Sequence, residues 1–572
     1  MKIPLKIPRL SLNLRKKHAE VSEVALLEMG KPKTLEEALS RCPYLQEYLE
    51  RIGRRPAYVE ELSYNTNPGE RADIIYPVGE GIFVHVETGG EVGHYNVIEP
   101  PKQSPQVIEE VESAVALMIT NSNSKNEKGK EKEKKDEKEK DEKKERAEVL
   151  TSLFKEAMKK GRLNVKGNPG WVLYHFLREK VGHGFLDPFL LDDYLEDISI
   201  PGGGRVFVYH KLFGYLETNV QVERAEVDRL LRSIAERYGK ILSFSNPIVD
   251  IHLPDGSRFN IVFGEDISLK GSNFTIRKFS KEPISVAHLI KWGTLSPEMA
   301  AYLWMLLETG VSCFVCGETA SGKTTTLNAL TAFIKPNAKV VSIEETPEVN
   351  IPHKNWVREV TRLHSGSPVT MFDLVKAALR QRPDYIIIGE IRGEEGRIAF
   401  QAIETGHPVI STMHAGNLGQ LFQRLTSDPI NVPKSHVDSL NLAIFQARVE
   451  RNHKFIRRVT SVNEIIGFDS DLGQLNFMPS FTYDFDADEH RFTGSSFLVE
   501  AKVLPLRGLG IGDLDRLYEE MRMRAGILKW LAENDPKYAS VWKTVISVDN
   551  YGVEWAYSRI EKGLKPWGEE EE

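Results

Sequence analysis

The central part of the chain alternates between short apolar runs and segments with helical periodicity. Apolar runs predict buried strands at residues 311–316, 339–343, 385–388 and 408–412. A segment with helical periodicity follows the first run, from Lys323 to Ile334. Thr370 and Asp373 form a predicted capping box for a further helix, which Pro383 stops. Strands that alternate with helices in this way predict a mostly parallel sheet with helices on both of its faces.

The flanking regions mix both patterns. Helices are predicted over residues 35–53, 148–159, 168–180, 222–238 and 513–532, and strands over residues 81–87, 198–200 and 205–209. The segment Leu253-Pro-Asp-Gly-Ser257 predicts a hairpin turn. The predicted fold class is therefore an α/β core, preceded by α+β domains and followed by an α/β C-terminal extension.

A charge run marks the clearest boundary. From Lys125 to Arg146, every residue except Asn126 and Gly129 is charged, with the two signs interleaved. Such a segment has no apolar side chains with which to form a core, so it is a linker or an extended charged helix. The predicted organisation is a basic tail (1–20), an N-terminal α+β domain (21–120), the charged linker (121–146), a second α+β domain (147–280), the core (281–470) and the extension (471–572).

Composition narrows the class of protein. The 572 residues are 41% hydrophobic and 27% charged, which indicates a soluble, globular chain. The net charge of −7 gives no whole-chain case for nucleic-acid binding. The sequence contains no run of 18 apolar residues, so no membrane span is expected. The basic N-terminus lacks the apolar segment of a secretory signal, and is either a disordered tail or a contact for an acidic surface.

The three cysteines indicate a reducing compartment. Cys313 and Cys316 form a C-x-x-C, but both fall in a predicted strand, which favours buried packing over a redox or metal role.

The segment Gly317-Glu-Thr-Ala-Ser-Gly322-Lys323-Thr324 is a G-x-x-x-x-G-K-[ST] phosphate-binding loop. It lies between a predicted strand and a predicted helix, as this motif requires, whereas a chance Gly-rich turn would not need those flanks. Lys323 is expected to reach the β and γ oxygens of a nucleotide, and the Thr324 hydroxyl to hold Mg²⁺. The predicted binding residues are Gly317, Glu318, Thr319, Ala320, Ser321, Gly322, Lys323, Thr324 and Thr325.

Acidic and histidine residues follow the next strands. Glu344 and Glu345 come at the end of strand 339–343, where a carboxylate could orient or deprotonate water, or form a solvated acidic turn. Glu390 follows strand 385–388 in the Walker B arrangement, which predicts an acid near Mg²⁺. His407 and His414 flank the fourth strand. We expect His414 to sense the γ-phosphate, against the alternative of a structural histidine.

These motifs, in this order, resemble the type II/IV secretion ATPase superfamily. The segment Ile343-Glu-Glu-Thr-Pro-Glu348 corresponds to the family's Asp box. The segment from Gly406 to His414 corresponds to its His box. The resemblance extends to Leu253–Arg258 and Phe274–Lys278, and it implies that Arg258 and Arg277 act as arginine fingers. Tyr76–His85, Asp187–Ser199 and Arg457–Glu464 resemble the archaeal branch, which drives pili, archaella or secretion systems.

The resemblance implies a RecA-like core, ATP and Mg²⁺ as ligands, and a homo-hexameric ring. It also implies a polytopic membrane platform protein as partner and a cytoplasmic location at the inner face of the membrane. Catalytic roles are expected for Glu344 as general base, Glu390, His414, Lys323, Arg258 and Arg277, with Thr324 and Glu390 at the metal. Two features depart from the family. Glu345 replaces the usual aspartate, which leaves the choice between Glu344 and Glu345 open, and no tetracysteine zinc module follows the core.

Two other functions fit the same motifs. A ring ATPase that translocates DNA is the main alternative, but the acidic net charge and the lack of a basic-aromatic groove pattern predict no direct nucleic-acid contact. Stimulation of ATPase activity by single-stranded DNA would favour it. The second alternative is a nucleotide-gated scaffold that does not hydrolyse ATP, and measured ATP turnover would exclude it.

Overall fold

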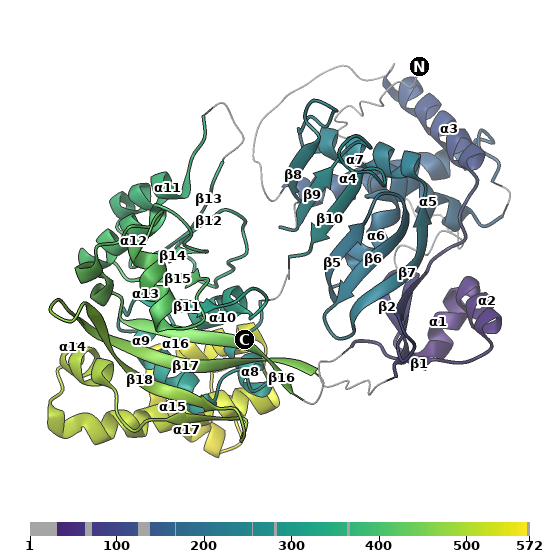
Figure 1. The fold of residues 1–572 in the computed structure, drawn as a ribbon. Coiled ribbons are helices and arrows are strands. Elements are labelled where there is room, and N and C mark those ends of the chain that lie inside the picture. The colour runs from purple at the N-terminus through teal and green to yellow at the C-terminus, as the bar shows by residue number, and fades with distance from the viewer. Residues whose placement is uncertain are drawn as a thin grey trace. The chain divides into compact units, whose positions relative to one another are not determined.

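The structure is a computed structural model that forms two compact units, Met1–Lys281 and Glu282–Glu572, each described here by itself (Figure 1). It describes residues 31–568 except 63–70, 124–137, 166, 254–255, 280–282, 363–366 and 452–453. The predicted basic tail and the first part of the charge run lie outside these described residues. No helix within them is long and apolar enough to cross a membrane.

The first unit contains a ten-stranded mixed sheet in the order β1-β2-β3-β4-β7-β6-β5-β10-β9-β8. Its strands are β1 (Ala57–Tyr58), β2 (Asp73–Gly79), β3 (Ile82–Glu87), β4 (Gly93–Ile98), β5 (Leu195–Ile200), β6 (Gly204–His210), β7 (Gly214–Val222), β8 (Ile248–His252), β9 (Arg258–Val262) and β10 (Asn273–Arg277). The strands therefore come from both sides of the charge run. The predicted hairpin at residues 253–257 is confirmed, because β8 and β9 pair antiparallel across it, although Pro254 and Asp255 lie outside the described residues.

The helices of the first unit are α1 (Leu35–Arg41), α2 (Pro43–Ile52), α3 (Pro105–Asn123), α4 (Lys138–Lys159), α5 (Pro169–Lys180), α6 (Asp187–Leu191) and α7 (Arg224–Arg237). The helical prediction over residues 35–53 is confirmed, although the stretch forms two helices, α1 and α2. Pro43 lacks an N–H and disfavours helical geometry at the preceding residue, so Cys42 leaves the helix and Pro43 begins a new one.

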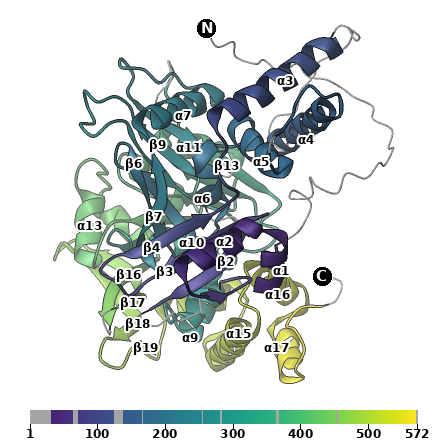
Figure 2. The ribbon, with the colours of Figure 1, turned by 90° about the vertical axis from the view of Figure 1, so that its right-hand side faces the viewer.

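Helices α3, α4 and α5 pack together (Figure 2). Phe154 and Phe176 are fully buried in the core that these helices form. The charge run is helical from Lys138 onward, because α4 begins there. Of the two alternatives left open by the sequence, the charged helix holds for this part of the run.

The second unit contains a nine-stranded sheet in the order β13-β12-β14-β15-β11-β16-β17-β18-β19. The first six strands in this order are parallel and the last three pair antiparallel. The strands are β11 (Cys313–Gly317), β12 (Val340–Glu344), β13 (Trp356–Val360), β14 (Tyr385–Ile388), β15 (Val409–Met413), β16 (Leu442–Arg451), β17 (Lys454–Asp469), β18 (Gln474–Asp484) and β19 (Glu489–Phe492). The four predicted core strands are confirmed, whereas β13 was not predicted.

Both faces of this sheet are covered by helices. On β11, Cys313 and Val315 face one core, while Phe314 and Cys316 face the other, because side chains alternate along a strand. One face is covered by α11 (Met371–Ala378), α12 (Glu395–Glu404) and α13 (Leu418–Thr426). The other is covered by α8 (Val286–Lys291), α9 (Pro297–Leu307), α10 (Lys323–Thr331), α15 (Leu514–Asn534), α16 (Tyr538–Tyr551) and α17 (Val553–Glu561).

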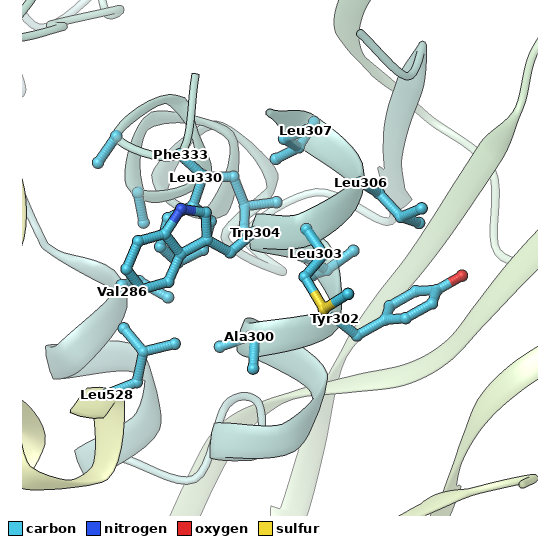
Figure 3. Close-up of a cluster of buried hydrophobic side chains, with 14 of the residues drawn as sticks. Val286, Ala300, Tyr302, Leu303, Trp304, Leu306, Leu307, Leu330, Phe333 and Leu528 are labelled. Atoms are coloured by element: carbon cyan, nitrogen blue, oxygen red, sulfur yellow. The ribbon is translucent and has the colours of Figure 1, made fainter. Parts of the chain in front are cut away.

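The hydrophobic core around α9 includes residues of α10 and of the C-terminal helices. Trp304 of α9 stacks on Phe333, with ring centroids 5.2 Å apart and an interplanar angle of 4°. Leu330 and Leu528 line the same cluster (Figure 3). The capping box at Thr370 and Asp373 is confirmed at the start of α11. Cys313 and Cys316 are buried, as predicted, and so is Cys42. The predicted domain boundaries stay a prediction, although the sheet continues beyond residue 470 through β18 and β19.

Candidate functional site

The phosphate-loop motif connects β11 to α10, in the strand-loop-helix arrangement that it predicts. Gly322 precedes the helix with φ 94°, and Ala320 has φ 63°. A Cβ on Gly317 would lie 2.2 Å from the Gln446 carbonyl oxygen, and a Cβ on Gly322 would lie 3.0 Å from Gln446 Nε2. Gly317 is therefore required by the close approach of the Gln446 backbone, and Gly322 is favoured by its positive φ.

Lys323 is buried at the first position of α10, with 8% of its surface exposed. Its Nζ donates to the Glu318 carbonyl at 2.9 Å and lies 3.4 Å from His414 Nδ1. Burial lowers the pKa of Lys323, and the nearby Glu390 carboxylate opposes that shift. The next residue, Thr324, is partly exposed.

Glu390 and His414 follow the carboxyl ends of β14 and β15, which pair in parallel. Because the ends of parallel strands meet at one edge of the sheet, the two residues are brought together: His414 Nε2 lies 3.0 Å from Glu390 Oε1. The other oxygen of Glu390 is hydrogen-bonded to the Arg392 guanidinium. Burial and Lys323 together lower the pKa of His414, which favours the neutral imidazole.

The geometry fits a polyphosphate and a divalent cation. Glu390 Oε1 is buried and has no hydrogen-bond partner among the described residues, despite the proximity of His414. A buried carboxylate oxygen without a donor is an acceptor free for a metal ion or for water bound to one. The Lys323 ammonium provides positive charge at the same place.

Glu344 and Glu345 differ sharply in their surroundings. Glu344 is 1% exposed, and its Oε1 accepts from the N–H groups of Glu348 and Val349 at 2.7 and 2.6 Å. Its Oε2 lies 3.4 Å from Arg358 Nε. Burial raises the pKa of Glu344 to about 7, although these donors and Arg358 oppose the shift. The Glu345 side chain is 50% exposed, and its oxygen lies 3.8 Å from the Arg392 guanidinium.

Several residues around the loop were missed by the sequence reasoning. Arg358, on the unpredicted edge strand β13, pairs with Glu344. Gln446 accepts a hydrogen bond from Thr326 Oγ1 at 2.7 Å, and Arg457 Nε donates to the Ala320 carbonyl at 3.1 Å. Glu395 accepts the N–H groups of Arg392 and Gly393, which fixes the segment after Glu390. Of these, only Arg457 lay in a stretch that the sequence had singled out.

Arg258 and Arg277 belong to the first unit, where they are cross-strand neighbours on β9 and β10. Both are exposed, while the alternating positions Phe274 and Ile276 are buried. Arg258 Nε also contacts Asp250 Oδ1 at 3.3 Å. Each arginine has a carboxylate nearby, since Arg277 also lies opposite Asp197 on β5. The pairing brings the two predicted fingers together, and their role stays a prediction.

Comparison with known proteins places this site in a family. A model of the family described as Type II/IV secretion system protein matches residues 180–453. The uncharacterized protein MJ0900 of Methanocaldococcus jannaschii is 43% identical over 528 residues, covering 86% of this chain and 93% of that protein. The chain belongs to the type II/IV secretion ATPase superfamily. The predicted family is thereby confirmed, and so is the predicted RecA-like α/β fold class.

Two further proteins are similar to part of the chain. Protein VirB11 of Agrobacterium fabrum is 28% identical over 267 residues, covering 42% of this chain and 77% of that protein. The solved structure of the ATPase DotB of Legionella pneumophila covers 66% of this chain and 96% of its own, with 18% identity and a TM-score of 0.38. The superfamily consists of ATPases.

Proposed function

We propose that this secretion-superfamily protein hydrolyses ATP and converts the energy into motion within a homo-hexameric ring. One observation carries the proposal. Lys323, His414 and Glu390 meet at the carboxyl ends of three adjacent parallel strands, beside a phosphate-binding loop. One buried oxygen of Glu390 has no hydrogen-bond donor in the part of the chain that the structure describes. This combination supplies a cation for phosphates and an acceptor for a metal in one place.

Each residue has a distinct task in the proposal. The loop residues 317–325 bind the phosphates, Thr324 and Glu390 hold Mg²⁺, and His414 senses the terminal phosphate. Mg²⁺, when bound, supplies positive charge that offsets charge on the phosphates. Glu344 is the general base, since its pKa near 7 suits proton transfer at neutral pH and Glu345 is largely exposed. Arg258 and Arg277 contribute positive charge from the first unit.

The work is directed at a polytopic membrane platform protein, with the ring cytoplasmic and peripheral to the inner face of the membrane. This part of the proposal is supported by family membership and by the resemblance to the archaeal branch. Co-purification of the chain with the membrane fraction only when a platform protein is co-expressed would test it.

ATP turnover by the purified full chain tests the enzymatic proposal. Lys323→Ala should abolish turnover and weaken nucleotide binding, because the buried cation is lost. Glu344→Gln should bind ATP normally and reduce turnover by about 10²-fold or more, since a general base contributes roughly that factor. Lys335→Ala, which removes an exposed lysine just beyond α10, is the matched control and should turn over like the wild type. Normal turnover in Glu344→Gln would show that another group is the base.

A further inference from the structure

Asn328 lies on α10, one helical turn after Thr324, and none of the family motifs includes it. Its side-chain amide forms two hydrogen bonds with the segment that follows the Glu344 strand. Asn328 Nδ2 donates to the Glu348 carbonyl at 2.9 Å, and Asn328 Oδ1 accepts from the Asn350 N–H at 3.1 Å. The amide therefore holds this segment as a neighbouring strand would.

The same segment, residues 348–350, also donates hydrogen bonds to the Glu344 carboxylate. The N–H groups of Glu348 and Val349 both donate to Glu344 Oε1, at 2.7 and 2.6 Å. Val349 is fully buried, so the segment is also fixed by packing. Residues 348–350 thus connect two polar groups: a carboxylate at the end of β12 and an amide on the phosphate-binding helix.

We infer that Asn328 is a positioning residue, which couples the phosphate-binding helix to the orientation of the Glu344 carboxylate. This inference rests on the proposed function for its catalytic meaning, though not for its geometry. The helix that begins at the phosphate loop carries Asn328, so a displacement of α10 would be transmitted through residues 348–350 to Glu344. Hydrogen bonds with both partners fixed transmit such a displacement better than apolar contacts do, because they are directional.

A C-terminal helix also contacts Asn328, through its backbone carbonyl. Tyr538, at the start of α16, donates to the Asn328 carbonyl at 3.4 Å and lies 3.3 Å from Thr331 Oγ1. His353, just beyond the segment, packs against Trp542 of α16 with the ring centroids 4.7 Å apart and the rings tilted by 54°. The coupling therefore lies between the ATPase sheet and α16, which gives the C-terminal extension a place in the site.

The test compares Asn328→Ala with Asn463→Ala. Asn463 is a buried asparagine on β17 whose side chain donates to Ser461 Oγ at 2.9 Å, so the control loses a hydrogen bond of the same kind elsewhere in the unit. In Asn328→Ala, kcat for ATP should fall about tenfold while KM and ADP affinity stay within twofold, because a poorly oriented base slows the chemical step without changing binding. The acidic limb of the pH–rate profile should move to higher pH, since looser N–H donors stabilise the ionised carboxylate less.

A second measurement does not depend on activity. The charged side chain paired with Glu344, among the described residues, is Arg358 on β13, and Asn328→Ala leaves this pair in place. The variant should lose more thermal stability between pH 5 and pH 8.5 than either the wild type or Asn463→Ala does. Equal losses in all three proteins would overturn the inference, as would an unchanged kcat. Absence of ATP turnover in the wild type would refute the proposed function instead, and the stability comparison would still decide the role of Asn328.

Discussion

The buried Glu344 carboxyl should make the second unit less stable at alkaline pH, and Glu344→Gln should remove that dependence. Burial raises the pKa of Glu344 to about 7 from an ordinary value of 4.5. The group therefore contributes stability that is fully present below pH 4.5 and is lost as pH rises through 7, where the folded protein must hold a buried charge. A difference of this size corresponds to about 3 kcal/mol, at roughly 1.4 kcal/mol for each pH unit between the two values.

Glutamine keeps the shape of the side chain and an acceptor oxygen for the Glu348 and Val349 N–H groups, but it does not titrate. We expect urea unfolding to show that, between pH 5 and pH 8.5, the free energy of unfolding falls by about 3 kcal/mol more in the wild type than in Glu344→Gln. Tryptophan fluorescence is a suitable probe, because every tryptophan except Trp171 belongs to the second unit. Parallel stability curves for the two proteins would refute the reasoning, since they would show that Glu344 ionises as easily in the folded chain as in the unfolded one.

Two further predictions concern the arginine pair and the core. Arg258→Ala and Arg277→Ala should each reduce ATP turnover about 10³-fold with nucleotide binding retained, as loss of an arginine finger does. Arg205→Ala, on β6 of the same sheet, is the control, and full activity in both finger variants would remove the proposal. Trp304→Ala should cost the second unit about 3–5 kcal/mol in urea unfolding followed by circular dichroism, because the residue is buried against Phe333. Trp555→Ala, at a partly exposed position, should lower the free energy of unfolding clearly less. A larger loss in Trp555→Ala than in Trp304→Ala would contradict this description of the core.

The sequence predicted the core strands and the phosphate loop because their signals are local. A buried parallel strand is a continuous apolar run, and the loop motif is contiguous. The order of the strands then explains why Glu390 and His414 meet, since each ends a strand in a parallel sheet. The edge strand β13 was missed because it has only five residues and the adjacent charges Arg358 and Glu359 interrupt its apolar positions.

Contacts between distant parts of the chain could not be predicted in the same way. Gln446 follows Thr326 by 120 residues, and neither residue type indicates the contact between them. The helical prediction over residues 35–53 missed the break between α1 and α2, which has a local cause, the effect of Pro43 on Cys42. The C-terminal region carried no motif, yet β18 and β19 extend the core sheet and α15 to α17 pack on it.

In the proposed function, Glu344 is a base that is difficult to ionise, and its surroundings give this property a use. A base whose pKa lies near 7 changes its protonation with small changes in its donors, because each hydrogen bond gained or lost shifts the balance between its two forms. The donors to Glu344 come from residues 348 and 349, whose neighbouring backbone groups are held by Asn328 on the phosphate-binding helix. The basicity of Glu344 would then depend on where α10 lies. Hydrolysis would be permitted when the phosphate loop is correctly filled, and the base would be weakly effective otherwise.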